Sequence, residues 1–336
     1  MLFKKYTLSN KIILMLGILL CIKGISHAQS QEKWESIIAM HYPSQGKVDA
    51  WVNEIWALSK SIKWNAKVMP NSPWGKNMGV RHKGRSRFIK FSAPNHDDFY
   101  AYWQPSLSGP APLLLHVPGY GAEMSAHPEL VEEGYNVLHV CPMGYVTPEG
   151  PDETKKVKGK WPVFPDTITS FGKEGYRHWL AQAIVAFSWA QTQPEVTPKR
   201  VSCFGTSQGG GGALLLGSLL KDHGIRCVAA DVPFLTNMPL ADGRGAYFRV
   251  PEGLAVTGIE GWRGIGLVDT LSHVHRLHCP ILLTAGGEDK VCPPETIESL
   301  YQRLLGIKAL IFLKETGHLY TEEFIPLAKA WFRIYG

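Results

Sequence analysis

The sequence predicts an α/β protein with a mostly parallel central sheet that helices cover on both faces. Six short, almost continuously apolar runs occur from residue 111 onward, and longer amphipathic stretches separate them. This alternation is typical of parallel strands joined by helices. Hydrophobic residues make up 45% of the chain and charged residues 19%, which excludes a disordered protein. The 336 residues fit one large domain behind a leader.

The six apolar runs are strand candidates because strands buried on both faces lack polar alternation. They cover residues 112–117, 136–141, 200–204, 226–232, 280–285 and 308–313. The predicted helices cover residues 126–133, 175–191, 208–222, 268–277, 294–305 and 321–334. Residues 85–92 and 98–104 predict an antiparallel strand pair at a sheet edge, joined by a turn at Pro94 and Asn95.

Three segments do not fit the alternation. Residues 29–84 predict a helical N-terminal extension packed on the main domain, residues 85–336, because the apolar side chains include Trp51, Ile55 and Leu58 at helical spacing. Residues 144–172 and 233–266 are rich in Pro and Gly and predict two long irregular loops that border the functional site.

The first 28 residues have the pattern of a secretory signal peptide. Lys4 and Lys5 precede an apolar stretch at residues 12–22, and a small-residue cleavage pattern ends at Ala28. The stretch is shorter than the roughly 20 residues that span a bilayer, so cleavage is favoured over a membrane anchor. A lipoprotein site at Cys21 is disfavoured because Leu20 precedes it. We therefore expect an exported protein, periplasmic or extracellular, without a stable membrane anchor.

The net charge of +6 comes largely from the leader, which holds four lysines and no acid. The remainder has 31 basic and 29 acidic residues, and this near balance argues against a nucleic-acid partner. Five cysteines remain after the leader, an odd number without the spacing of a disulfide scaffold. Four lie in or beside apolar runs, which indicates buried thiols rather than nucleophiles.

A nucleophile motif stands between a predicted strand and a predicted helix. Gly205, Ser207 and Gly209 fit G-x-S-x-G, in which a tight turn projects the serine hydroxyl and the glycines permit close packing. The strand ends just before the motif and the helix begins just after it. This context predicts Ser207 as a catalytic nucleophile.

A serine nucleophile needs a base, and the base needs an orienting acid. Asp289 follows the strand at 280–285, and His318 follows the strand at 308–313, at the ends where parallel sheets place their chemistry. Glu288 and Asp231 are alternative acids, and Asp289 is favoured over both. His273, His275 and His278 cluster before a strand without a matching ligand motif, so we expect no metal and no other cofactor.

The negative charge of a tetrahedral intermediate requires backbone N–H donors. One candidate is the amide of Gln208 at the start of the helix. The other is the amide of Tyr120, which follows Pro118 and Gly119 after the first parallel strand, because Pro118 has no N–H to donate.

The motif Gly205-Thr206-Ser207-Gln208-Gly209-Gly210-Gly211 resembles the elbow of the acetyl xylan esterase and cephalosporin C deacetylase family of α/β-hydrolases. Residues 231–235, residues 289–294 and Gly317-His318 agree with it. The resemblance covers roughly residues 85–334 and implies deacetylation of sugars or small esters. It also implies Ser207, His318 and Asp289 as the triad, with the amides of Tyr120 and Gln208 as the oxyanion hole.

The chain departs from the family pattern in its loops. Pro118 stands where the family has His, Met143-Gly144-Tyr145 replaces an R-G-Q motif, and Leu319 replaces a Glu after the histidine. Tyr145 is predicted to replace the lost bracing at the substrate site. Trp161 could stack on a sugar ring or serve packing. The family forms hexamers. Because of these departures, the resemblance does not imply a hexamer here, and a homo-oligomer is one open alternative.

The leading hypothesis is therefore a secreted hydrolase, a carbohydrate acetylesterase that acts on an acetylated carbohydrate or a small acetyl ester. A serine peptidase or amidase of the same fold is the first alternative, because the triad serves both reactions. A non-catalytic glycan-binding protein is the second.

Overall fold

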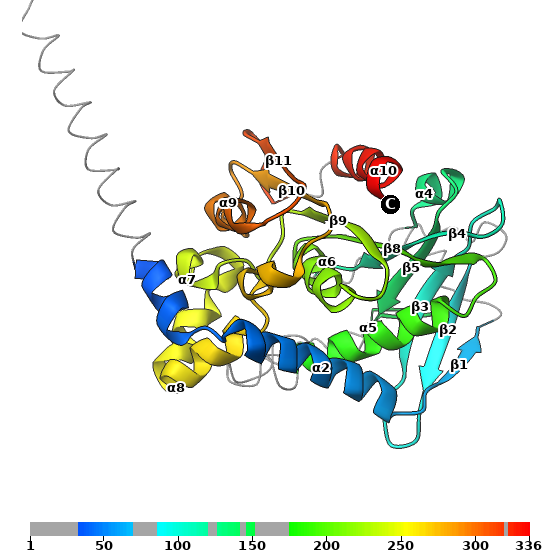
Figure 1. The fold of residues 1–336 in the computed structure, drawn as a ribbon, viewed down its shortest axis with the longest axis horizontal. Coiled ribbons are helices and arrows are strands. Elements are labelled where there is room, and N and C mark those ends of the chain that lie inside the picture. The colour runs from blue at the N-terminus through cyan, green and yellow to red at the C-terminus, as the bar shows by residue number, and fades with distance from the viewer. Residues whose placement is uncertain (1–32, 70–85, 120–125, 142–145, 152–174, 319–321) are drawn as a thin grey trace, which may run out of the picture. The chain divides into compact units, whose positions relative to one another are not determined.

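The computed structural model describes residues 33–69, 86–119, 126–141, 146–151, 175–318 and 322–336. The predicted signal peptide and Tyr120, Tyr145 and Trp161 lie outside these residues. Contacts divide the chain into two units, residues 1–41 and residues 42–336. In the first unit, residues 33–41 are helical. The second unit holds the sheet and the helices around it (Figure 1).

A nine-stranded sheet forms the centre of the second unit, in the order β1-β2-β3-β5-β4-β8-β9-β10-β11. The strands from β5 to β11 in this order run parallel, and β1, β2 and β3 pair antiparallel. The mostly parallel sheet is confirmed. The strands are β1 (Asn65–Val68), β2 (Arg87–Ser92), β3 (Phe99–Gln104), β4 (Ala111–Val117), β5 (Asn136–Cys141), β8 (Val196–Thr206), β9 (Ile225–Asp231), β10 (Ile281–Gly286) and β11 (Lys308–Leu313).

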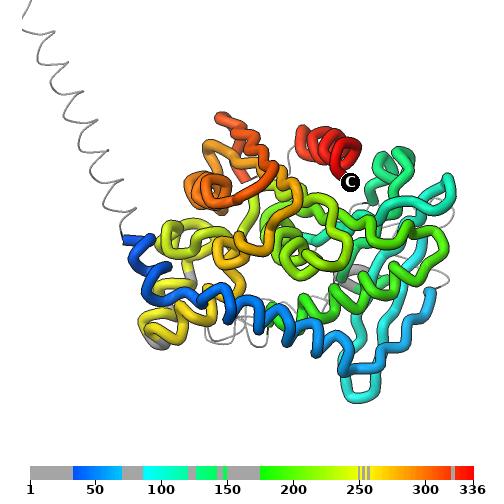
Figure 2. Tube along the Cα trace, in the orientation of Figure 1, coloured from blue at the N-terminus to red at the C-terminus, as the bar shows by residue number. Residues whose placement is uncertain are grey.

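Helices cover both faces of the sheet (Figures 1 and 2). On one face, α4 (Pro128–Glu132) and α10 (Phe324–Tyr335) join strand residues such as Leu114 and Phe204 in one buried cluster. On the other face lie α2 (Gln45–Ser61), α5 (Tyr176–Ala190) and α6 (Gln208–Leu219). Burying Phe332 of α10 contributes about 2–3 kcal/mol. Among the described residues, no helix has the length and apolar composition to cross a bilayer.

The segment at residues 233–266 differs from the prediction. It forms α7 (Met238–Ala241), the 3₁₀ helix η5 (Gly245–Tyr247) and α8 (Arg249–Gly266), so the predicted irregular loop is wrong here. Proline is tolerated in the first turn of a helix, where Pro251 lies. Gly258 adopts a φ of 55° and kinks α8. The other predicted loop contains a small hairpin, β6 (Val146–Thr147) and β7 (Gly150–Pro151).

Three further elements differ in detail from the sequence predictions. Residues 65–68, within the extension predicted to be helical, form edge strand β1 and pair with β2. Strand β8 begins at Val196, four residues before the predicted start. The predicted helix at 268–277 is the 3₁₀ helix η6 (Thr270–Arg276), and α9 (Pro294–Arg303) follows β10. At the turn between β2 and β3, Asn95 has the left-handed φ of 61° that such turns require.

The order of the strands reverses at β4. The chain passes from β4 to β5 on one side, whereas β8 lies on the other side. Ligand sites of open α/β sheets lie beyond the carboxyl ends of the strands at such a reversal. The ends of β4 and β8, at Val117 and Gly205, are register partners there.

Candidate active site

Ser207 occupies a sharp turn between β8 and α6. Its φ of 59° and ψ of −119° lie in a strained region for a residue with a side chain, a cost of about 1–3 kcal/mol. The turn brings α6 so close to β4 that a Cβ at Gly205 or Gly209 would collide with the Val117 carbonyl oxygen. The two glycines of the motif are therefore required by this approach of the backbones.

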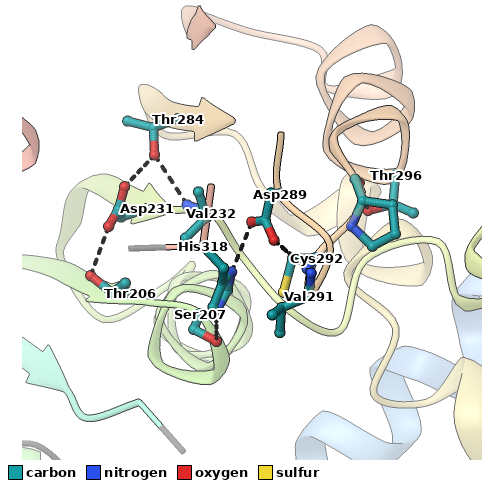
Figure 3. A network of polar contacts seen from close by, with 11 residues as sticks. Thr206, Ser207, Asp231, Val232, Thr284, Asp289, Val291, Cys292, Thr296 and His318 are labelled. Atoms are coloured by element: carbon teal, nitrogen blue, oxygen red, sulfur yellow. Dashed lines mark hydrogen bonds and ion pairs between the residues drawn. The ribbon is translucent and has the colours of Figure 1, made fainter. Parts of the chain in front are cut away.

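His318 connects the serine to an acid. Its Nε2 lies 2.8 Å from the Ser207 Oγ, and its Nδ1 lies 2.8 Å from the Asp289 Oδ2 (Figure 3). With the Nδ1 proton donated to the carboxylate, Nε2 is left as an acceptor for the serine hydroxyl. The structure thus brings together the three residues that the sequence predicts as a triad.

The Asp289 carboxylate is held by its own loop. Its side chain is fully buried, and Oδ1 accepts the backbone N–H groups of Val291 at 2.8 Å and Cys292 at 2.9 Å. These bonds leave Oδ2 directed at His318. The neighbouring Glu288 is exposed, so of the two adjacent acids only Asp289 bonds to the imidazole among the described contacts.

Asp231, the other alternative acid, has different partners. Its carboxylate accepts hydrogen bonds from the hydroxyls of Thr206, at 3.0 Å, and Thr284 (Figure 3). Burial raises the pKa of Asp231 to about 6, although the two threonines and the nearby His318 act against this rise. Asp231 is therefore a buried acid beneath the elbow rather than the hydrogen-bond partner of the histidine.

Cys292 is a neighbour of the site that the sequence did not single out. Its side chain is fully buried, and a ligand atom of each of Asp289, Cys292 and His318 lies within 4.8 Å of the others. Burial raises the pKa of the Cys292 thiol well above its usual range, and the Asp289 charge raises it further, whereas a hydrogen bond with Ser207 acts the other way. The thiol is thus protonated at neutral pH and is not itself a nucleophile.

The predicted oxyanion donors are only partly described. Gln208 is the first residue of α6, so its amide lies at the positive end of a helix. Tyr120 lies outside the described residues. Gly119, the last described residue before it, passes beside the elbow, because a Cβ there would lie 3.3 Å from the Thr206 carbonyl oxygen.

Two of the three histidines considered as a metal site, His273 and His275, have hydrogen-bond partners outside the triad. His273 bonds to the Ser218 hydroxyl at 2.8 Å and to the Leu267 carbonyl at 2.9 Å. His275 lies 3.1 Å from an Asp49 carboxylate oxygen. These contacts tie η6 to α6 and α2, and none of them involves a residue of the predicted triad.

A second group of histidines lies between the sheet and α4. His116 of β4 and His139 of β5 are register partners, and their Nδ1 atoms are 2.8 Å apart. His139 Nε2 lies 2.7 Å from Gln104 Oε1. The ring of His127, at the start of α4, packs against both. These three histidines are scattered in the sequence, so only the register of β4 and β5 reveals the group.

Comparison with known proteins shows a family and a fold. The family model of acetyl xylan esterase (AXE1) matches residues 88–334. The acetyl esterase Axe7A of Xylanibacter ruminicola is 24% identical over 256 residues, which cover 70% of this chain and 56% of Axe7A. The uncharacterized protein YfhR of Escherichia coli is 24% identical over 239 residues, covering 69% of this chain and 72% of YfhR. The chain thus spans little more than half the length of Axe7A.

Solved structures share the fold. Acetyl xylan esterase 1 from a Thermoanaerobacterium species superposes with a TM-score of 0.70 and 20% identity over 88% of this chain and 95% of that one. An acetyl xylan esterase from a Paenibacillus species superposes with a TM-score of 0.67 and 18% identity, over 90% of this chain and 99% of that one. An acylaminoacyl peptidase of Pyrococcus horikoshii superposes with a TM-score of 0.51 and 14% identity, over 78% of this chain and 43% of that one. These similarities confirm the predicted α/β-hydrolase fold.

Proposed function

This chain belongs to the acetyl xylan esterase (AXE1) family of carboxylic ester hydrolases, and we propose that it is an exported serine esterase. It removes O-acetyl groups from carbohydrates through a Ser-His-Asp triad and an acyl-enzyme. The observation that carries the proposal is the unbroken chain of hydrogen bonds from Asp289 through His318 to Ser207, with 2.8 Å at both steps.

The geometry accounts for each proton transfer. Ser207 Oγ attacks the acetyl carbon while its proton passes to His318 Nε2, and the same proton then goes to the sugar oxygen as the ester bond breaks. Water attacks the acetyl-serine, gives a proton to His318, and acetate leaves as Ser207 regains that proton. Asp289 keeps the imidazole in one tautomer and stabilises its positive charge. The amides of Gln208 and Tyr120 hold the oxyanion of each tetrahedral intermediate.

A direct test compares wild type with Ser207→Ala for acetate release from p-nitrophenyl acetate and from acetylated plant polysaccharides. The variant is expected to lose at least about 10⁴-fold in kcat. Ser61→Ala, at the exposed end of α2, is the matched control and retains the rate. Full activity of Ser207→Ala would contradict the proposal, and the best polysaccharide would identify the substrate, to which Tyr145 and Trp161 are proposed to bind.

Peptide hydrolysis is the second candidate, because the fold is shared with an acylaminoacyl peptidase and the same triad could cleave an amide. Parallel assays on N-acetylated peptides and acetylated xylan separate the two, and a higher kcat/KM on the peptide would favour the peptidase. Glycan binding that persists in Ser207→Ala, without acetate release from wild type, would favour a binding protein instead.

Export is proposed from the leader. We expect the protein secreted by a host cell to begin at Gln29, with residues 29–84 as an extension and residues 85–336 as the catalytic domain. Intact-mass analysis of the periplasmic and medium fractions tests both the cleavage site and the compartment. A full-length protein that stays with the membrane fraction would contradict cleavage.

A further inference from the structure

Three different donor groups meet at the acid loop. The carboxylate of Asp289, the thiol of Cys292 and the imidazole of His318 each place one ligand atom within 4.8 Å of the other two. Figure 3 shows both Cys292 and His318 beside Asp289. The proposed ester hydrolysis uses the carboxylate and the imidazole, but it assigns no role to the thiol.

The backbone of Cys292 is held beside the acid by hydrogen bonds. The Cys292 N–H donates to Asp289 Oδ1, as does the N–H of Val291. Pro293 and Pro294 follow at once and begin α9, where the Thr296 N–H and hydroxyl both donate to the Pro293 carbonyl. The loop that orients the acid therefore also places the backbone of Cys292 next to it.

The donor set indicates which ion would fit. One sulfur, one nitrogen and one carboxylate oxygen suit a borderline-soft divalent cation such as Zn²⁺ or Cd²⁺, which is often held by three protein ligands with a fourth position open. The hydroxyl of Ser207 lies 2.8 Å from His318 Nε2, beside one of these three ligand residues. Mg²⁺ and Ca²⁺ prefer six or more oxygen ligands, and a single carboxylate does not supply them.

We propose that Asp289, Cys292 and His318 form an inhibitory site for a thiophilic divalent cation. When the cation binds, Cys292 releases its thiol proton to solvent as the sulfur–metal bond forms. The imidazole and carboxylate become ligands, so His318 can no longer accept the Ser207 proton. The His318 side chain is 19% exposed, so a cation from solvent can meet the imidazole, whereas Cys292 is buried. The inhibition rests on the proposed esterase function, whereas the binding does not.

Binding is tested without turnover, by titrating the full chain with Cd²⁺ and following the ultraviolet absorption of the cadmium–thiolate bond. Wild type and Cys279→Ser, the matched control at a partly buried cysteine outside the site, are expected to show one saturable Cd²⁺ site per chain. Cys292→Ser is expected to lose this absorption and to bind Cd²⁺ more than about 10-fold more weakly, since even supporting groups of metal sites cost 10–100-fold. Equal Cd²⁺ absorption in Cys292→Ser and wild type, or none in wild type, would overturn the site.

Inhibition is tested by acetate release at increasing Zn²⁺, with each variant normalised to its own rate without metal. The half-inhibitory Zn²⁺ concentration is expected to rise more than about 10-fold in Cys292→Ser but not in Cys279→Ser, and Mg²⁺ has no effect. An unchanged Zn²⁺ response in Cys292→Ser would overturn the inhibitory role. If no ester is hydrolysed by wild type, the proposed function fails, and the Cd²⁺ titration still decides whether the cation site exists.

Discussion

The Thr206 hydroxyl and the Asp231 carboxylate are hydrogen-bonded at 3.0 Å, so the residue before Ser207 is tied by its side chain to the next strand. The Ser207 N–H also donates to the Asp231 carbonyl, at 2.9 Å. A buried acid thus supports the elbow through both its side chain and its backbone. The pH dependence of this support is opposite in sign to that of the buried histidines His116 and His139.

The first prediction concerns Asp231. Burial raises its pKa from 3.8 to about 6, so between these values the folded state binds more protons than the unfolded state. Its contribution to stability is present at low pH and is lost as pH rises through about 6, by up to about 3 kcal/mol. Asp231→Asn is expected to be less destabilising, relative to wild type, at about pH 7.5 than at about pH 4.5. Urea unfolding at both pH values measures this, and an equal effect at both would contradict the shift.

The histidine group predicts the opposite trend. Burial lowers the pKa of His116 and His139 well below 6.5, and their mutual repulsion and that of His127 lower the pKa of His116 further. The unfolded state then binds more protons below pH 6.5, so the free energy of unfolding falls as pH falls below that value. His139→Gln is expected to weaken this acid sensitivity. In wild type the pH trends of Asp231 and of the histidines oppose each other. Urea unfolding of Asp231→Asn and of His139→Gln across the same pH range therefore measures each contribution to the free energy of unfolding separately.

The choice of acid predicts unequal effects of two adjacent substitutions. Asp289→Asn removes the partner of His318 Nδ1 and is expected to lower kcat by roughly 10⁴-fold, because the imidazole loses its fixed tautomer. Glu288→Gln, at the exposed neighbour, is the control and keeps kcat. Acetate release from p-nitrophenyl acetate measures both. A comparable loss of kcat in Glu288→Gln would contradict the assignment of Asp289 as the orienting acid.

Because α6 lies so close to Val117 at the elbow, replacing glycine by alanine there is predicted to destabilise the protein rather than to stabilise the helix. Alanine in a helix is normally about 0.5–1 kcal/mol more favourable than glycine, and Gly46→Ala in α2, where a Cβ meets open space, is expected to stabilise the protein. Gly209→Ala in α6 instead forces a Cβ into the Val117 carbonyl and is expected to lower stability and activity together. Thermal unfolding of the two variants gives the comparison, and a higher Tm for Gly209→Ala would contradict it.

Much of this architecture follows from local pattern in the sequence. The apolar runs that became β4, β5 and β10 match the structure within one residue, because strands buried on both faces are largely apolar. The run that became β11 matches as well, although this edge strand is only partly buried. The serine elbow could also be predicted from a short segment, since Ser207 and its two flanking glycines stand at the junction of a predicted strand and a predicted helix. Residues 233–266 were misread because Pro and Gly suggest loops, although Pro251 in the first turn of α8 and Gly258 at its kink are compatible with helix.

Short segments of the sequence were therefore enough to predict the fold class, Ser207 as the nucleophile and the chain order of its partners. The folded chain was needed to show that Asp289 rather than Asp231 contacts His318, and that Cys292 lies near the same groups. Ser207 and His318 are 111 residues apart, and Asp289 and His318 are 29 apart. Contacts at such separations are set by the pairing of β8, β9, β10 and β11 in one sheet, because strand order and register bring the strand ends, and the loops that follow them, to a common edge.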